Sequence, residues 1–277
     1  MINPDLKKMT KMRIAVLGPE YSYSHLVGKK IFPKQELIFC SKIEEVFQKI
    51  TEKKVEQGII PLENMLQGSV RESILGLWKH RVKINRAYTI PIRHCLAGKN
   101  RSYTKIASHP QALAQCAIFL SEKEAIECSS TSKAMEMAAQ SDNFAAIGSP
   151  EAAAHYGLQI FQENIEDNHD NVTRFLVISL EETIAEKNVK TSLLLKPKED
   201  RPGLLVHLLA PFAAQNINLA KIESLPSGRK MGEYVFYLEI DGNTTEERVK
   251  VVLDYLRNNA EVYSFGSYEA TSLEWTG

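Results

Sequence analysis

Apolar runs and helix-type repeats alternate along the first two thirds of the chain. Residues 13–18 (RIAVLG) have the short apolar run of a buried strand, and residues 22–32 have the spacing of an amphipathic helix. The same alternation returns at 58–64 and 68–80, at 103–108 and 109–120, and at 143–149 and 150–158. Strands that alternate with helices predict an α/β fold with a mostly parallel sheet covered on both faces.

Polar residues stand at each of the expected helix starts. Ser69 stands three residues before Glu72, as in a capping box, and Ser149 directly precedes Pro150. The other starts carry Ser22 and Ser24, and Ser108 and His109. Each residue taken singly is most simply a helix cap. Taken together they predict a site for a small anion, because the carboxyl ends of parallel strands gather at one edge of a sheet, beside the helix N-termini.

The last third of the chain has a different pattern. Residues 179–191 are charged and lack a strong apolar stripe, which predicts a linker over 182–190. The residues that follow have the β-α-β-β-α-β order of a ferredoxin-like unit, with a turn over 226–232. Its first helix is expected to bury Leu204, Leu205, Leu208, Leu209 and Phe212, and its second to begin with a capping box of Thr244 and Glu247. Such a unit binds a metabolite or dimerises, and the pattern alone does not choose.

Composition narrows the classes of function. The 277 residues suffice for two domains, and 34 basic residues balance 34 acidic ones, which argues against wrapping nucleic acid or coating a membrane. The four cysteines form no C-x-x-C pair, so neither a zinc site nor a redox motif is expected. No apolar run is long enough for a membrane span or a signal-peptide core, which predicts a cytoplasmic protein.

The segment NVTRFLVI, residues 171–178, sets polar groups at the start of an apolar strand. In an extended chain Asn171 and Thr173 point to one face and Arg174 to the other. The Thr173 hydroxyl donates or accepts, and the Arg174 guanidinium matches a carboxylate. The alternative for Arg174 is an ion pair with Asp167 or Asp170 that fastens the loop.

The segment PLEN places Glu63 and Asn64 at another strand end, shortly before Ser69. The alternative is that Glu63 lies in solvent and Asn64 only shapes the turn. The chain has no G-x-G-x-x-G after its first strand, no Walker loop, no H-E-x-x-H and no G-x-S-x-G. No cofactor or metal is therefore expected.

Seven segments, in order from residue 13 onward, resemble signatures of the prephenate dehydratase family: GPEYSYSHL, PLENMLQGSV, HCLAG, SHPQALAQC, STSKAMEMAA, AAIGSPEAAAHYGLQI and NVTRFLVI. The C-terminal unit resembles the ACT regulatory domain of that family. The resemblance implies a catalytic region over 13–181 with a second subdomain over about 93–165, and an ACT domain over 191–277. Two α/β subdomains, similar in fold to type II periplasmic binding proteins, would form a cleft. No chorismate mutase segment precedes the first motif, so the resemblance is to the single-activity form.

The resemblance also implies a reaction. Such enzymes are cofactor-independent lyases that convert prephenate to phenylpyruvate in L-phenylalanine biosynthesis. Thr173 matches the essential threonine of the family and would donate a hydrogen bond to the departing hydroxide, while Glu63 would relay or orient a proton. The expected substrate-binding residues are Ser24, Asn64, Ser69, Asn171, Arg174 and Phe175. Arg174 would either contact a carboxylate of the substrate or hold Thr173 in place.

The ACT region departs from the family pattern at two positions. Leu225 stands where the family commonly has arginine in Glu-Ser-Arg-Pro, and Leu204 stands where the family has the alanine of Gly-Ala-Leu. The expected ligand residues are Gly203, Leu204, Asn216, Asn218, Glu223 and Ser224. We expect dimerisation through this domain, as a homodimer or homotetramer, and a phenylalanine sensitivity that is weakened or shifted to another ligand.

Two other functions are compatible with the sequence. An arogenate dehydratase would make phenylalanine directly from the aminated substrate, and one hydrogen-bonding contact suffices for that distinction. A non-catalytic small-molecule sensor would use the same fold for binding alone. The TRF and PLEN segments weigh against the sensor.

Overall fold

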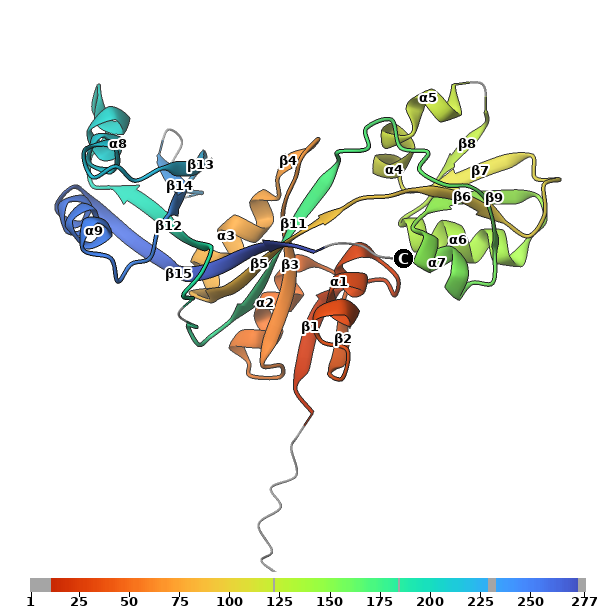
Figure 1. Ribbon diagram of the computed structural model, residues 1–277, viewed down its shortest axis with the longest axis horizontal. Helices are drawn as coiled ribbons and strands as arrows, with labels where there is room; N and C mark the ends of the chain where they lie inside the picture. The colour runs from red at the N-terminus through yellow and green to blue at the C-terminus, as the bar shows by residue number, and fades with distance from the viewer. Residues whose placement is uncertain (1–10, 122, 184, 229–232, 274–277) are drawn as a thin grey trace, which may run out of the picture.

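The computed structural model describes residues 11–121, 123–183, 185–228 and 233–273 (Figure 1). Part of the turn expected over 226–232 therefore lies outside the described residues. Within these ranges the strands form two sheets. The molecule has three parts, which are from left to right in Figure 1 a C-terminal unit, a first lobe and a second lobe. The first lobe contains both ends of the catalytic region expected from the sequence, and the second lobe lies between them in the chain.

The larger sheet runs through the C-terminal unit and the first lobe. Its order is β13-β14-β12-β15-β5-β11-β3-β1-β2, with β4 paired to β3. Its strands are β1 (Arg13–Leu17), β2 (Glu36–Cys40), β3 (Gln57–Asn64), β4 (Gly68–Ser69), β5 (Lys83–Pro91), β11 (Val172–Ser179), β12 (Val189–Pro197), β13 (Leu219–Pro226), β14 (Tyr234–Asp241) and β15 (Ala260–Ser272).

The smaller sheet forms the second lobe, in the order β10-β6-β9-β7-β8. Its strands are β6 (Cys95–Gly98), β7 (Lys105–Ser108), β8 (Ala125–Glu127), β9 (Phe144–Gly148) and β10 (Gln159–Gln162). The helices in the described part of the chain are α1 (Tyr23–Ile31), α2 (Ile43–Thr51), α3 (Arg71–His80), α4 (Pro110–Gln115), α5 (Ala117–Leu120), α6 (Thr131–Gln140), α7 (Pro150–His155), α8 (Leu204–Ala214) and α9 (Glu247–Asn259).

The prediction of a mostly parallel sheet is wrong, because both sheets contain parallel and antiparallel strand pairs. β1 pairs in parallel with β2 and β3, but β11 runs antiparallel to both β3 and β5. In the second lobe β7 pairs in parallel with β8 and β9, whereas β6 runs antiparallel to β9 and β10. The reason is the path of the chain: it leaves the first lobe along β5 and returns along β11, so these two neighbours run in opposite directions.

Three of the predicted helix starts are confirmed. Ser22 accepts from the backbone N–H of His25 at the start of α1, and Ser149 accepts from that of Ala152 at the start of α7. His109 caps α4 through its ring nitrogen. These caps follow the strand ends as the sequence predicted.

The two predicted capping boxes are wrong. Ser69 lies in β4, paired with Glu63, and α3 begins only at Arg71 with no side-chain cap. Thr244 lies three residues before the start of α9, and its Oγ1 is 3.1 Å from Ser267 Oγ. Ser69 is thus already part of a strand, and the hydroxyl of Thr244 contacts β15 instead of a helix N–H.

The C-terminal unit has the predicted β-α-β-β-α-β order. Leu208 and Phe212 of α8 and Leu253 of α9 share one buried cluster, but Leu205 is 39% exposed and does not belong to the predicted buried face. β12 begins at Val189, inside the range expected for the linker.

The C-terminal unit is joined to the first lobe by strand pairing. β15 runs parallel to β5, with Glu269 opposite Arg86 and Ser272 opposite Thr89. One buried cluster spans the junction and includes Leu225 and Tyr237 of the unit together with Ile84 of the first lobe. No helix among the described residues is both long and apolar enough to cross a bilayer.

Candidate functional site

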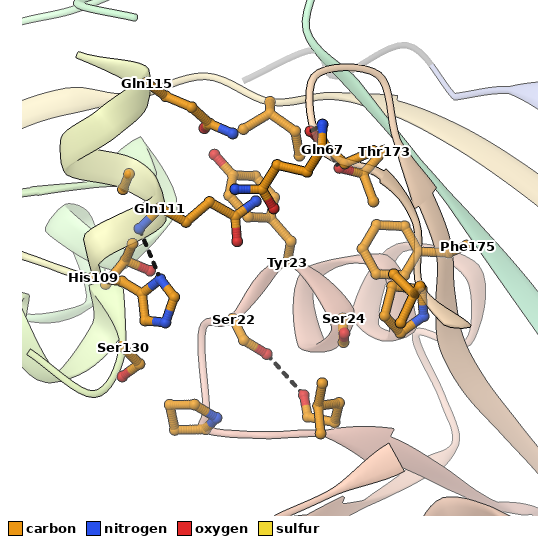
Figure 2. Close-up of a pocket in the computed structure, with 18 of the residues that line it drawn as sticks. Ser22, Tyr23, Ser24, Gln67, His109, Gln111, Gln115, Ser130, Thr173 and Phe175 are labelled. Carbon is orange, nitrogen blue, oxygen red and sulfur yellow. Dashed lines mark hydrogen bonds between the residues drawn. The ribbon is translucent and has the colours of Figure 1, made fainter. Parts of the chain in front are cut away.

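A cavity of about 450 Å³ lies between the two lobes. Such a volume is typical of a site for a small molecule. In Figure 2, Tyr23, Thr173 and Phe175 of the first lobe face Gln111 and Gln115 of the second. Each lobe thus forms one wall of the cavity, and two segments of the chain connect the lobes.

These two segments, residues 92–94 and 165–171, cross between the lobes side by side. The N–H of Ile92 donates to Asn171 O at 2.9 Å, and the N–H of Ile165 donates to His94 O at 3.1 Å. Tyr23 Oη donates to Arg93 O at 2.5 Å. Burial, aided by the charge of Glu151, raises the pKa of Tyr23, so its hydroxyl stays protonated.

Asn64 is the centre of a hydrogen-bond group on the wall of the first lobe that includes Thr173. Asn64 Nδ2 donates to Thr173 Oγ1 and to Asn171 Oδ1, both at 2.9 Å. The orientation of the Asn64 amide is fixed, because its Oδ1 accepts from the N–H groups of Leu66 and Gln67. Thr173 Oγ1 is therefore an acceptor towards Asn64, which leaves its own proton available to a molecule in the cavity.

Gln115 presents a donor from the second lobe. Its Oε1 lies 2.9 Å from His94 Nε2, and its Nε2 is buried without a partner among the described residues. Burial lowers the pKa of His94, so the ring is neutral and donates through Nε2 to the Gln115 oxygen. The amide N–H groups of Gln115 are then directed to a ligand, since an unpaired buried donor is costly.

The electrostatics of the cavity come from backbone groups rather than from charged side chains. Among the described residues its lining holds no Asp, Glu, Lys or Arg. Its lining instead includes Tyr23 and Thr131, the first residues of α1 and α6, and Val70, which directly precedes α3. Helix N-termini carry unsatisfied N–H groups and the positive end of the dipole. The arrangement suits an anionic ligand.

The structure brings most of the predicted site residues together. The cavity is lined by Ser24, Asn64, Ser69, Thr173 and Phe175. Asn171 lies directly behind this wall, where it accepts from Asn64.

Glu63 and Arg174 do not line the cavity. They lie on the opposite face of β3 and β11, where Arg174 Nη2 is 2.5 Å from Glu63 Oε1 and Arg174 Nη1 is 2.6 Å from Glu239 Oε1. The alternative ion pair with Asp167 or Asp170 is wrong, since Arg174 pairs with these two glutamates.

The predicted ACT ligand residues lie at the start of α8, in the segment between α8 and β13, and in β13 itself. Leu204 is packed in the core of the unit, and Asn218 Nδ2 donates to Asp241 Oδ2 at 2.7 Å. Glu223 faces the first lobe, 3.7 Å from Arg71. Gly203, at the start of α8, and Asn216 have positive φ angles of 78° and 52°, and Ser224 is exposed on β13.

Sequence reasoning missed several residues of the cavity. The cavity is also lined by residues that the sequence does not predict individually: Tyr23, His94, Gln111, Gln115 and Ser130. They lie within the segments GPEYSYSHL, HCLAG, SHPQALAQC and STSKAMEMAA. The available signal was thus the family resemblance of those segments, because a search for charged chemistry passes over amides and hydroxyls.

The chain is similar to known proteins in sequence and in fold. The family model for prephenate dehydratase matches residues 14–183, and that for the ACT domain matches residues 199–255. A prephenate dehydratase of Methanocaldococcus jannaschii is 36% identical over 266 residues, covering 90% of this chain and 95% of that protein. Arogenate dehydratase/prephenate dehydratase 1 of Arabidopsis thaliana is 34% identical over 275 residues, covering 91% and 70%. The crystal structure of a prephenate dehydratase from Arthrobacter aurescens in complex with L-Phe has a TM-score of 0.85 and 28% identity, covering 93% and 90%.

Proposed function

Since this chain belongs to the prephenate dehydratase family and is a lyase of that class, we propose that its cleft converts prephenate to phenylpyruvate with Thr173 as the hydrogen-bond donor. The observation that carries this proposal is the Thr173 hydroxyl, which accepts from Asn64 and keeps its own proton for the cavity. The reaction belongs to phenylalanine biosynthesis.

For this reaction the protein needs to position the substrate and to donate one hydrogen bond to the leaving oxygen. Prephenate carries two carboxylates and a ring hydroxyl. The electron pair of the bond to the departing carbon dioxide enters the ring, and the ring C–O bond breaks with its pair as hydroxide leaves. Formation of the aromatic ring supplies the driving force. A hydroxyl donor stabilises the charge that develops on the leaving oxygen without losing its own proton first.

The dianion is held by neutral donors. The Gln115 amide and the helix starts at Tyr23, Val70 and Thr131 offer N–H groups around the cavity. In a site screened from water such donors bind anions without a fixed positive charge. Because Glu63 lies on the far face of β3 and is paired with Arg174, we assign it no proton relay.

The same lining favours prephenate over arogenate. The two substrates differ in a keto or an amino side chain, and an ammonium group favours a carboxylate partner. Among the described lining residues none is acidic. An arogenate dehydratase with this lining would offer the ammonium group backbone, amide and hydroxyl oxygens but no carboxylate.

The test is a pair of parallel assays with purified protein. One follows phenylpyruvate from prephenate and the other phenylalanine from arogenate, each with a blank for the acid decay of the substrate. We expect a much higher kcat/KM for prephenate. Preference for arogenate would overturn the substrate assignment, and binding without turnover of either would favour the sensor.

Phenylalanine is the effector we propose for the ACT domain. The relative from Arthrobacter aurescens was crystallised with L-Phe, and an ACT domain is present here at residues 199–255. Leu225 is fully buried and has no positive charge, unlike the arginine that the family commonly has at this position. This difference supports a weakened response of the enzyme to phenylalanine. Activity measured over a phenylalanine titration to millimolar concentration checks this, and strong inhibition at low concentration would contradict it.

The ACT domain also offers a surface for a homodimer. β13 is an edge strand of the larger sheet, and its Ile222 is 45% exposed; Val206 of α8 is 73% exposed. An exposed edge with apolar neighbours favours pairing with another strand. Light scattering after size-exclusion chromatography distinguishes the dimer from a tetramer or monomer. The cytoplasmic location remains a prediction from sequence.

A further inference from the structure

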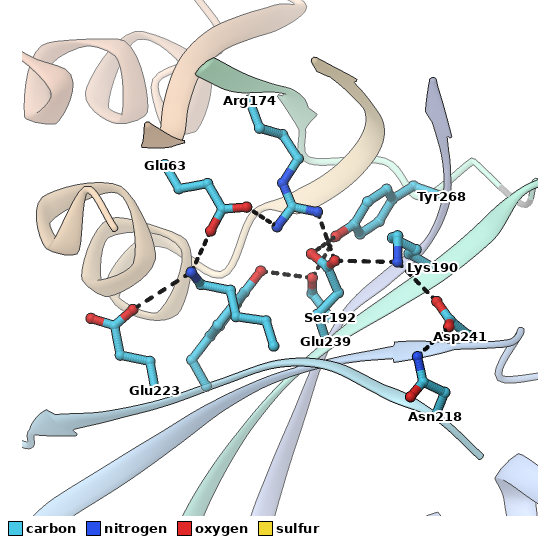
Figure 3. Close-up of polar contacts among 11 residues, drawn as sticks. Glu63, Arg174, Lys190, Ser192, Asn218, Glu223, Glu239, Asp241 and Tyr268 are labelled. Carbon is cyan, nitrogen blue, oxygen red and sulfur yellow. Dashed lines mark hydrogen bonds and ion pairs between the residues drawn. The ribbon is translucent and has the colours of Figure 1, made fainter. Parts of the chain in front are cut away.

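A cluster of charged residues joins the ACT domain to the back of the cavity wall (Figure 3). We call it the ionic cluster; its members are Glu63, Arg174, Lys221, Glu223 and Glu239. Lys221 Nζ donates to Glu63 Oε2 and lies 4.0 Å from Glu223 Oε2. Arg174 bridges Glu63 and Glu239 through its two terminal nitrogens.

The ionic cluster is largely withdrawn from water. The side chain of Glu239 is 1% exposed and that of Arg174 is 12% exposed. Glu239 Oε2 also accepts from Tyr268 Oη at 3.1 Å. Burial opposes the charge of Glu63, but the hydrogen bond from Lys221 and the charge of Arg174 lower its pKa on balance. Removing one member of such a buried group leaves another charge uncompensated, which is costly.

The ionic cluster and the catalytic group occupy opposite faces of one strand pair. In the register of β3 and β11, Thr173 lies opposite Asn64 and Arg174 lies opposite Glu63. On the cavity face the Asn64 amide bonds to the Thr173 hydroxyl. On the other face the guanidinium of Arg174 bonds to Glu63. Successive residues of a strand share one backbone, so the Arg174–Glu63 pair and the Thr173–Asn64 pair are joined through β3 and β11.

We propose that Lys221 and Glu239 are positioning residues for the elimination, because they hold Glu63 and Arg174 and so set the geometry of the Asn64–Thr173 pair from outside the cavity. The inference rests on the proposed function of Thr173. By this inference, residues of the ACT domain hold β11, the strand that carries Thr173, in its position in the same chain.

The position of Glu223 extends the cluster towards the effector region. Glu223 was predicted from the sequence as an ACT ligand residue, and it lies 3.7 Å from Arg71, the first residue of α3. A ligand that draws Glu223 away would change the surroundings of Lys221. The ionic cluster thus offers a physical route between the two sites, as coupling through a contiguous network requires.

The test compares two lysines of the ACT domain with similar exposure. The Lys221 side chain is 16% exposed, and that of Lys196, which pairs with Glu261 at 3.3 Å, is 15% exposed. The variants are Lys221→Met and, as the matched control, Lys196→Met. We expect Lys221→Met to lower kcat for prephenate by roughly twofold to thirtyfold with KM nearly unchanged. Lys196→Met should keep both constants.

Two further variants separate positioning from folding. Lys221→Arg keeps the cation and should restore most of kcat, and Glu239→Gln keeps the shape and should lower kcat as Lys221→Met does. All are assayed well below their Tm. Equal kcat for Lys221→Met and Lys196→Met, or a change in KM alone, overturns the inference. Absence of turnover in the unaltered protein would instead overturn the proposed function.

Discussion

At the scale of single residues, Thr173 and Arg174 show that the sequence of a strand predicts the face on which each side chain lies, but not its distant partners. The alternation predicted that Asn171 and Thr173 share a face, and both accept from Asn64. It also placed Arg174 on the other face. Its partner Glu239 could not be predicted, because this residue is 65 positions away and comes near only through the joined sheets.

The Asn64 amide fixes the direction of the Thr173 proton. An Asn64→Asp variant replaces the donor with a carboxylate, which would accept the proton of Thr173 and turn it from the cavity. We expect kcat for prephenate to fall roughly a hundredfold to a thousandfold. Steady-state kinetics with folding checked by circular dichroism measure this. A variant with nearly unchanged kcat would show that the Asn64 contact is dispensable.

Gln115 is expected to act mainly in substrate binding. A Gln115→Met variant keeps the size of the side chain but loses the N–H groups aimed at the ligand. Loss of a hydrogen bond to a charged group should raise KM by roughly tenfold to 150-fold, with a smaller effect on kcat. A large loss of kcat at unchanged KM would mean that Gln115 contacts the reacting atoms instead.

At the scale of helices and strands, the sequence predicted helix caps in the segments that follow strands, such as Ser22 and Ser149. It failed at Ser69 and Thr244, because a capping-box spacing does not say whether the first residue is already in a sheet contact. The mixed order of the sheets was also missed, since the return of the chain along β11 is a property of the fold and not of any local pattern.

Two serines allow a matched test of capping. Ser149 accepts from the N–H of Ala152 in α7, whereas Ser69 is in β4 and caps no helix. Ser149→Ala should reduce the free energy of unfolding by about 1 kcal/mol, and Ser69→Ala should have a smaller effect. Chemical denaturation compares them. Equal losses would contradict the assignment of Ser149 as a cap.

At the scale of the whole molecule, the sequence predicted both α/β lobes and the ACT unit but not their junction. The pairing of β15 with β5 joins the ACT sheet to the first lobe, and the cluster around Ile84 and Tyr237 covers the junction. This pairing is between strands distant in the chain, so no local pattern indicates it. The ionic cluster follows from it, because the junction brings Lys221 to Glu63.

The ionic cluster should make stability depend on acid pH. The pKa of Glu63 is lower in the folded chain than the usual 4.5, so its contribution to stability is present above pH 4.5 and is lost as the pH falls through the folded pKa. The Tm difference between the unaltered protein and Glu63→Gln should be constant from neutral pH to about 5 and shrink at lower pH. Glu124→Gln, at an exposed pair with Lys105, is the control. A difference that does not change with pH would contradict the charged state of Glu63.

The most direct measurement of the central claim is the steady-state turnover of prephenate by a Thr173→Ala variant beside the unaltered protein. Thr173 lines the cavity, and its hydroxyl is the donor that we place at the leaving oxygen. We expect kcat to fall roughly a hundredfold to a thousandfold while KM changes little, and Thr173→Ser to recover part of the rate. A Thr173→Ala protein that keeps nearly the full kcat would contradict the claim.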